Sequence, residues 1–540
     1  MPSHIASLPD EILSEIFLIY RLVNETKSFQ RVPRNLENHY IFFRITHVCR
    51  RWRQVAHQTP LLWTNIVCYP RVHAHKDIPV YDEIVSTMLE LSQAVPLRFT
   101  LQYNWPEHPK LVTALRENIH RITYLLANIP TSILGLGAPI IFELFKFPIP
   151  QLRHLHIVSS QLPSELNPEQ ISLSGAQLPV LESLSLENFP METALQLIRP
   201  TLKSFSFTQM FSRRVVPRNT FLHALLSMPS LEILEIVNGG FGQWPSPPPT
   251  LISLHRIKKI TIVDGFDILM WFLSVLRIPR DAHLGLSISS PLDYISLQRL
   301  QDFSHKYKAL LDFSFGGPRP KPVDVTLHVG APGFTESFRI EAFSQFLTEE
   351  ELDLPDMHNA ITGSSFEPVS PSSFYLSFPA SSRAVFTKQL CSSLPLDDAQ
   401  RICLTIVEPN LGRGNIDNIV GVLFRMVSIQ TLYIQGGRES DIVQIFQATT
   451  QQAARDHIFP PLPALRFVKL KGVHFDIDDV PSTDQLEALN LTDDEASATN
   501  EDGAGLCATL RAWKAWYGHP EIMVELLEGC YQAPESDGDV

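Results

Sequence analysis

The chain has 540 residues, of which 44% are hydrophobic and 19% charged, a composition that predicts a folded protein with several domains or a repeat array. Its net charge of −13 argues against nucleic acid as the main ligand, because phosphate binding needs a basic face. The six cysteines form no C-x-x-C pair, and no stretch reaches the roughly 18 apolar residues of a membrane span. With no signal-peptide pattern at the start, we expect an intracellular protein, cytoplasmic and/or nuclear.

The first predicted element is a helix that begins near residue 8. Pro9 suits the first turn, and the carboxylates of Asp10 and Glu11 favour the positive end of the helix dipole. Apolar residues then recur at helical spacing and are expected to form one stripe: Ile12, Leu13, Ile16, Phe17 and Tyr20.

A second helix is predicted over residues 42–56, where Phe43, Val48, Trp52 and Val55 are apolar and the arginines between them are solvated. Thr59-Pro60 then breaks the chain before Leu61, Leu62 and Trp63.

Three segments of this region resemble, in order, the landmarks of an F-box: LPDEILSEIF (8–17), VCRRWRQVA (48–56) and TPLLW (59–63). The following segment, TNIVCYP (64–70), is similar to the large F-box families of mushroom-forming (basidiomycete) fungi. The resemblance covers about the first 70 residues. It departs from the usual pattern at residues 22–40, a polar insertion where an F-box ordinarily has a short turn.

This resemblance implies a small helical bundle that docks on a Skp-type adaptor, which joins a cullin-based ubiquitin ligase. The implied adaptor-binding residues are Leu8, Pro9, Ile12, Leu13, Ile16, Phe17, Val48, Cys49, Trp52, Leu62 and Trp63. The last five supply either partner contact or the core of the bundle, and the alternative for the whole stripe is a core role. Because about 60 residues bury little by themselves, partner contact is favoured for the first helix.

The body of the chain repeats a unit of the form apolar-x-x-apolar-x-apolar. It begins at Leu152, Leu181, Leu202, Leu231 and Ile257, which lie 29, 21, 29 and 26 residues apart, and it returns at Ile429 and Leu465. These periods resemble leucine-rich repeats. The last two apolar residues of each unit should point inward from a parallel strand, while residues 192–198, 221–228 and 268–276 have helical periodicity.

We therefore predict an α+α/β architecture, a small helical F-box module followed by an irregular leucine-rich-repeat-like βα solenoid. The expected divisions are residues 1–70 for the F-box domain, 71–475 for the solenoid, 476–505 for an acidic flexible loop with ten carboxylates, and 506–540 for a cap and tail. Between residues 264 and 429 the pattern weakens to isolated strand-like runs. An ordinary α/β domain is the alternative.

The residue between the two inward positions of each strand should point outward and line a binding face. These candidate target-binding residues are His156, Ser185, Ser206, Glu235, Thr261, Tyr433 and Lys469.

Catalytic and cofactor signatures are weak throughout the sequence. His73 and His75, separated by one residue, are of the kind found on surfaces, and Asp476 opens the acidic run, so we expect no metal, no cofactor and no enzyme activity. The leading hypothesis is a substrate receptor of a ubiquitin ligase that binds a protein target and neither nucleic acid nor membrane. The alternatives are a scaffold that holds the adaptor outside any ligase and, in a third class, a hydrolase within the irregular middle of the chain.

Overall fold

The structure is a computed structural model of the chain. It describes the following residues: 8–29, 41–68, 78–102, 109–129, 145, 147–159, 178–209, 217–239, 241, 251–279, 281–289, 296–312, 324–329, 337–343, 372–379, 394, 396–406, 411, 413–456, 462–475, 506, 509–510, 523–526 and 531–532. The chain divides into two compact units, Met1–Ser246 and Pro247–Val540. The predicted acidic loop at residues 476–505 lies outside the described residues.

The first unit begins with helices and continues as alternating strands and helices. Its elements are α1 (Asp10–Phe29), η3 (Ile41–His47), α2 (Arg50–His57), η4 (Pro60–Trp63), β1 (Asn65–Cys68), α3 (Ile78–Leu91), β2 (Leu97–Gln102), α4 (Pro109–Glu117), η5 (Ile119–Arg121), β3 (Ile122–Ile129), β4 (His154–Ser159), β5 (Ser183–Glu187), α6 (Met191–Gln196), β6 (Ser204–Thr208), α7 (Arg218–Leu226) and β7 (Ile233–Val237).

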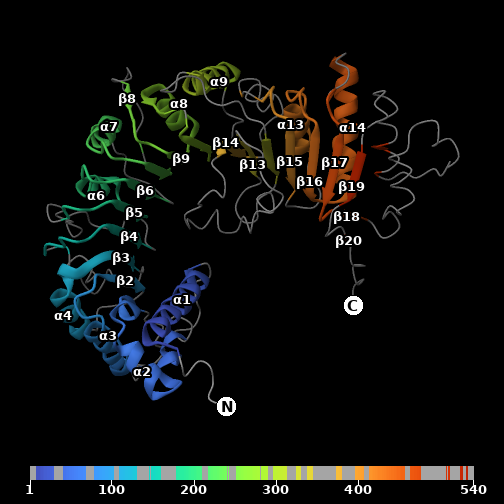
Figure 1. The fold of residues 1–540 in the computed structure, drawn as a ribbon. Coiled ribbons are helices and arrows are strands. Elements are labelled where there is room, and N and C mark those ends of the chain that lie inside the picture. The colour runs from blue at the N-terminus through green and yellow to red at the C-terminus, as the bar shows by residue number, and fades with distance from the viewer. Residues whose placement is uncertain are drawn as a thin grey trace, which may run out of the picture. The chain divides into compact units, whose positions relative to one another are not determined.

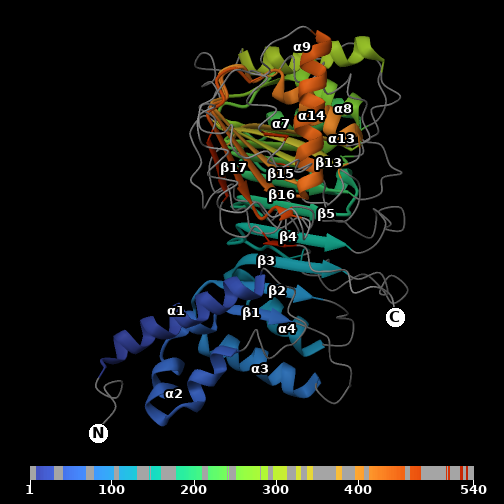
Figure 2. The same ribbon diagram turned by 90° about the vertical axis from the view of Figure 1, so that its right-hand side faces the viewer.

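The strands of the first unit run in parallel, in the order in which they occur in the sequence, from β1 to β7. Figure 1 shows α3, α4, α6 and α7 along one side of these strands, and Figure 2 shows β1 to β5 edge to edge. β1 is hydrogen-bonded in parallel to β2, and the first compact unit extends from Met1 to Ser246.

The predicted alternation is present in β4 to β7. In each of these strands the second and fourth residues are buried apolar side chains, and the residue between them is half-buried. The buried set is Leu155, Ile157, Leu184, Leu186, Phe205, Phe207, Leu234 and Ile236. Each strand therefore buries one face against its own unit and leaves the other available.

A left-handed residue follows several strands at a fixed distance from the repeat start. Each of these residues lies seven positions after the first apolar residue of its sequence repeat: Asn188 (φ 60°), Asn238 (φ 51°), Gly436 (φ 73°) and Gly472 (φ 60°). Asparagine and glycine tolerate this conformation best, so the residue at this position sets how the chain leaves the strand.

The second unit has these elements: β8 (Ile252–Ser253), β9 (Lys259–Asp264), α8 (Phe266–Val275), β10 (Leu276–Arg277), β11 (His283–Ile288), α9 (Leu297–Asp312), β12 (Asp324–Val329), β13 (Ser337–Phe343), β14 (Ser372–Pro379), β15 (Arg401–Ile406), α13 (Arg413–Leu423), β16 (Thr431–Gly436), α14 (Glu439–Asp456), β17 (Phe467–Lys471), β18 (His474–Phe475), β19 (Met523–Leu526) and β20 (Tyr531–Gln532).

The strand order of the second unit departs from an uninterrupted parallel array. It reads β9-β11-β14-β13-β12-β15-β16-β17-β19, and β13 is antiparallel to both of its neighbours. A regular solenoid would place β12 beside β11, whereas β14 occupies that position. The chain here folds back on itself, so the middle of the predicted repeat region is a three-stranded meander inserted between parallel strands.

Helices cover part of the second unit. α8 contacts β9 and β11 and packs against α9, and α13 packs against α14. α8 follows Gly265 and buries most of its apolar side chains, including Trp271 and Phe272. In the predicted C-terminal cap, Leu506 and Leu510 are buried, and β19 pairs in parallel with β17. No helix in the described part of the chain combines the length and apolarity needed to cross a bilayer.

Candidate partner-binding site

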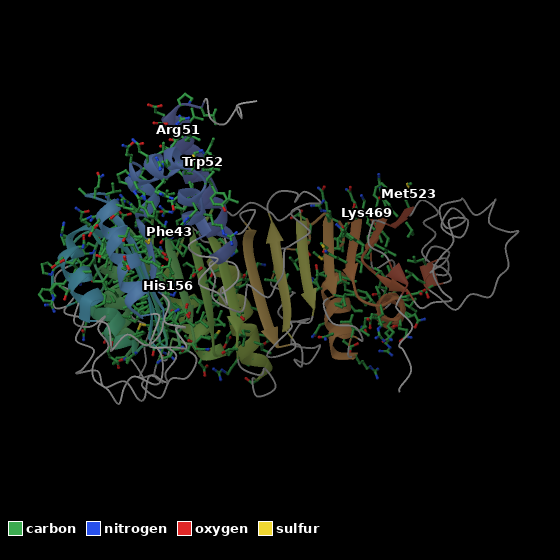
Figure 3. The ribbon with its side chains drawn as sticks, turned by 90° about the horizontal axis from the view of Figure 1, so that it is seen from below. Phe43, Arg51, Trp52, His156, Lys469 and Met523 are labelled. Carbon is green, nitrogen blue, oxygen red and sulfur yellow. The ribbon has the colours of Figure 1, made fainter. Side chains whose placement is uncertain are left out.

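The N-terminal module, residues 1–70, is held together by aromatic side chains. Phe17 of α1 lies 5.1 Å from Trp52 of α2, measured between ring centroids, and Phe43 of η3 lies 5.3 Å from Trp63 of η4. Figure 3 labels Phe43 and Trp52 on these helices. The indole Nε1 of Trp63 donates a hydrogen bond of 2.8 Å to the carbonyl of Ala56, so its polar atom is satisfied inside the core.

Polar contacts fix the start of α1 against α2. Arg51 donates through Nη2 and Nε to Oδ1 of Asp10, at 2.7 and 3.0 Å, and also to the carbonyl of Leu8. Cys49 caps α2, with its Sγ accepting from the backbone N–H of Trp52 at 3.5 Å. The contacts of Arg51 therefore join the start of α1 to α2, across separations of 41 and 43 residues.

The rest of α1 is tied to the segment around η4. Ser14 Oγ lies 3.0 Å from Thr59 Oγ1, and the buried Arg21 donates to the carbonyl of Leu61 and to Thr64 Oγ1. Because these groups share one face with Leu13 and Phe17, α1 has a fixed rotation about its axis.

An apolar row remains exposed on the other face of α1. Ile12 and Ile16 are 47% and 42% exposed, and Ile19 and Val23 continue the row at spacings of three and four residues. Tyr20 and Leu22 border it, and Val48 and Leu61 are exposed apolar side chains elsewhere in the module. Residues spaced in this way lie on one side of a helix, so they form a continuous surface.

The predicted adaptor-binding residues fall into two groups. Leu13, Phe17, Leu62 and Trp63 are at most 1% exposed and form the core of the module instead of its surface. Leu8 and Trp52 are half-buried, and Pro9, Ile12, Ile16, Val48 and Cys49 are exposed. The stripe expected as one surface is therefore two faces, one inward and one outward.

Sequence reasoning did not single out Ile19, Leu22, Val23 or Leu61 as surface residues. The signal was present in the spacing 12-16-19-23, which follows the helical period more closely than the spacing 13-17-21 of the inward face. The arginine at position 21 made the series 13-17-21 look like the exposed one, because a charged residue ordinarily marks the solvent side of a helix.

The candidate target-binding residues lie in two separate sets. His156, Ser185, Ser206 and Glu235 are direct neighbours across β4 to β7 and form one half-buried row, with His156 Nε2 3.3 Å from Glu187 Oε1. Figure 3 labels His156 in this row and Lys469 in the second unit.

In the second unit, Thr261 is half-buried on β9, and Tyr433 and Lys469 are neighbours on β16 and β17. Lys469 Nζ lies 3.2 Å from Glu525 Oε2. Tyr433 was predicted as an outward contact, but it is only 2% exposed, and its neighbour Cys403 on β15 is buried as well. The alternation of buried and half-buried positions is therefore interrupted here, since β15 and β16 each have three consecutive buried residues.

No group of three or more histidine, cysteine or acidic side chains among the described residues could hold a metal ion. His73 and His75, the pair weighed as ligands, lie outside the described residues. Residues 5–69 match the family model described as F-box-like. No curated protein matches the chain.

Proposed function

We propose that this chain is the substrate receptor of a Skp/cullin/F-box ubiquitin ligase. The F-box-like domain supports the first half of the proposal, since domains of this kind generally bind Skp-type adaptors. The observation that carries the proposal is the exposed apolar row on α1, Ile12, Ile16, Ile19 and Val23, within that domain.

The physical case for a partner on this row rests on its independence from the module's own core. Leu13 and Phe17 are at most 1% exposed and fill the core on the inward face of α1, whereas Ile12, Ile16 and Ile19 keep 42–57% of their surface exposed. Burial of one such side chain is worth about 1.5–3 kcal/mol. A helix that offers several of them in one row is suited to a hydrophobic surface on another protein.

We further propose that the strands belong to a leucine-rich-repeat-like solenoid that binds the protein target. The outward row from His156 to Glu235 would contact that target. Support comes from the parallel register of β1 to β7, from the buried alternation, and from the left-handed turn after the strands. On this proposal the chain is no enzyme: it positions a target for ubiquitin transfer by other subunits, in the cytoplasm and/or the nucleus.

The proposal is tested by a pull-down with purified Skp-type adaptor. The full chain is compared with an Ile12→Asp/Ile16→Asp variant and with Leu226→Asp, a control that places a carboxylate on another exposed apolar residue, in α7. We expect the double variant to lose binding and the control to retain it, with both melting like the wild type. Binding that survives the double substitution would contradict the proposal.

A second experiment separates the ligase from a scaffold that acts without one. The adaptor complex is mixed with a purified cullin, and recruitment is measured by size-exclusion chromatography. Co-elution of the three proteins supports the receptor, whereas an adaptor complex that excludes the cullin supports the scaffold.

A further inference from the structure

A cavity of about 690 Å³ opens on the first unit, at the amino-terminal ends of β2, β3 and β4. Its lining residues are Pro96, Arg98, Thr123, Tyr124, Pro150, Gln151, Arg153, His154 and Val180. We call it the Arg98 pocket. Its volume lies within the range of natural ligand sites, and none of the described lining residues is acidic.

Strand register brings the pocket's functional groups together from segments far apart in sequence. Arg98, Tyr124 and His154 are direct neighbours on β2, β3 and β4. The guanidinium carbon of Arg98 lies 4.5 Å from the ring centroid of Tyr124, and that ring lies 6.1 Å from the ring of His154. Stacking on the tyrosine orients the planar guanidinium and reduces its conformational freedom.

The second arginine is oriented by an ion-pair chain beside the pocket. Arg153 Nη1 lies 3.2 Å from Glu182 Oε1, and Lys203 Nζ lies 2.9 Å from the other oxygen, Oε2. Glu182 thus pairs with both Arg153 and Lys203, and together with Arg98 these four side chains carry a net positive charge. The positive charge at this pocket is opposite in sign to the net charge of the whole chain, which is −13.

Arginine side chains recognise carboxylates and phosphates, because the guanidinium fork matches the spacing of their oxygens. The row that begins with Arg98, Tyr124 and His154 continues across Ser183 of β5 and Ser204 of β6, both half-buried. An extended peptide could therefore place an anionic group in the pocket and continue over hydroxyl groups.

We propose that the Arg98 pocket binds an anionic group, a carboxylate or a phosphate, carried by an extended segment of a protein ligand. The proposal deepens the proposed function, because it assigns the target a chemical character. Peptide binding to the pocket can be measured by itself, since it requires no adaptor.

The test uses the full chain and three fluorescein-labelled peptides that differ at two adjacent positions, carrying glutamates, phosphoserines or glutamines. Binding is measured by fluorescence anisotropy. We expect at least one anionic peptide to bind ten-fold or more tightly than the glutamine peptide and to weaken as salt is raised. Comparison of the glutamate and phosphoserine peptides distinguishes a carboxylate ligand from a phosphate ligand.

Arg98→Ala and Arg153→Ala should each weaken anionic-peptide binding about ten-fold, the loss of a charge-assisted contact. Arg116→Ala is the matched control, because Arg116 also stacks on a ring, 4.8 Å from the centroid of Phe147, outside the pocket. It should leave binding unchanged. Arg153 is mostly exposed, so its removal tests the pocket even if Arg98→Ala folds poorly.

Equal binding of all three peptides by the wild type, or an equal loss in Arg116→Ala, would overturn the proposal. The adaptor pull-down is run on the same preparations. Loss of peptide binding with adaptor binding intact would contradict the pocket proposal and leave the proposed function standing. Loss of adaptor binding with peptide binding intact would contradict the proposed function and leave the pocket proposal standing.

Discussion

Phe17 on α1 and Trp52 on α2 meet with ring centroids 5.1 Å apart and ring planes inclined by 56°. This contact joins the first predicted helix to the second across the residues that the sequence marks as an insertion. With Phe17 turned inward, Ile16, the residue immediately before it, lies about 100° away around the helix axis and is 42% exposed.

The neighbouring pair Ile16 and Phe17 should respond oppositely to truncation. Phe17→Ala removes a ring that is 1% exposed and should lower the free energy of unfolding of the module by about 3–5 kcal/mol. Ile16→Ala should change it by less than about 0.5 kcal/mol, because that side chain is exposed. Urea titration with hydrogen exchange over residues 8–68 measures both. Similar losses in the two variants would show that the inward and outward faces of α1 are assigned incorrectly.

Gly436 should tolerate alanine far less well than Gly265. Gly436 has a φ of +73°, and an added Cβ would meet the carbonyl oxygen of Ile406 at 2.4 Å, whereas no atom lies within 4 Å of a Cβ at Gly265. We expect Gly436→Ala to destabilise the second unit by more than about 2 kcal/mol. Gly265→Ala should cost at most about 1 kcal/mol, as the loss of a glycine cap on α8.

Thermal unfolding of the two glycine variants, followed by circular dichroism, checks this prediction. An unchanged melting temperature for Gly436→Ala would mean that the chain leaves β16 by another path.

Asn188 combines a left-handed backbone with a side-chain contact. Its Nδ2 donates to the carbonyl of Ser159 at 2.8 Å, and its φ is 60°. Asn188→Ala should cost about 1–3 kcal/mol, because it loses the hydrogen bond and strains the backbone. Asn188→Gly loses only the hydrogen bond and should be the milder change by about 1 kcal/mol. Urea denaturation distinguishes the two; a glycine variant less stable than the alanine variant would contradict the conformational argument.

Acidification should destabilise the first unit partly through His154. Burial lowers the pKa of His154 below its usual 6.5; Glu182 opposes the shift, and Arg98, Arg153 and Lys203 add to it. The unfolded chain therefore takes up this proton more readily than the folded chain, so stability falls as the pH drops through the ordinary histidine range. His154→Gln should lose less melting temperature than the wild type between about pH 7.5 and about pH 5.5.

Two neighbouring groups, Glu182 and Tyr124, titrate outside the pH range of that experiment. The hydrogen bond from Lys203 lowers the pKa of Glu182, which loses its contribution only at a more acidic pH, and burial raises the pKa of Tyr124, which titrates well above the range. Identical pH profiles for wild type and His154→Gln would contradict the role of His154.

The module and the inward strand positions could be predicted because both depend on local patterns. Pro9 and Asp10 mark the start of a helix through the properties of its first turn, and the alternation of Leu184 and Leu186 follows from the two-residue period of a strand. Such features need only neighbours within a few residues.

Tertiary structure decided which apolar residues of α1 face outward, since Ile12 and Leu13 are equally hydrophobic, and contacts of Ser14, Phe17 and Arg21 with distant residues fix the rotation of the helix. It also decided that β14 lies between β11 and β13, and that Tyr433 is buried. The Arg98 pocket exists because the register of β2, β3 and β4 aligns three side chains from separate segments. Strand pairing joins backbone groups that are distant in sequence, and no local pattern specifies which distant segment becomes the partner.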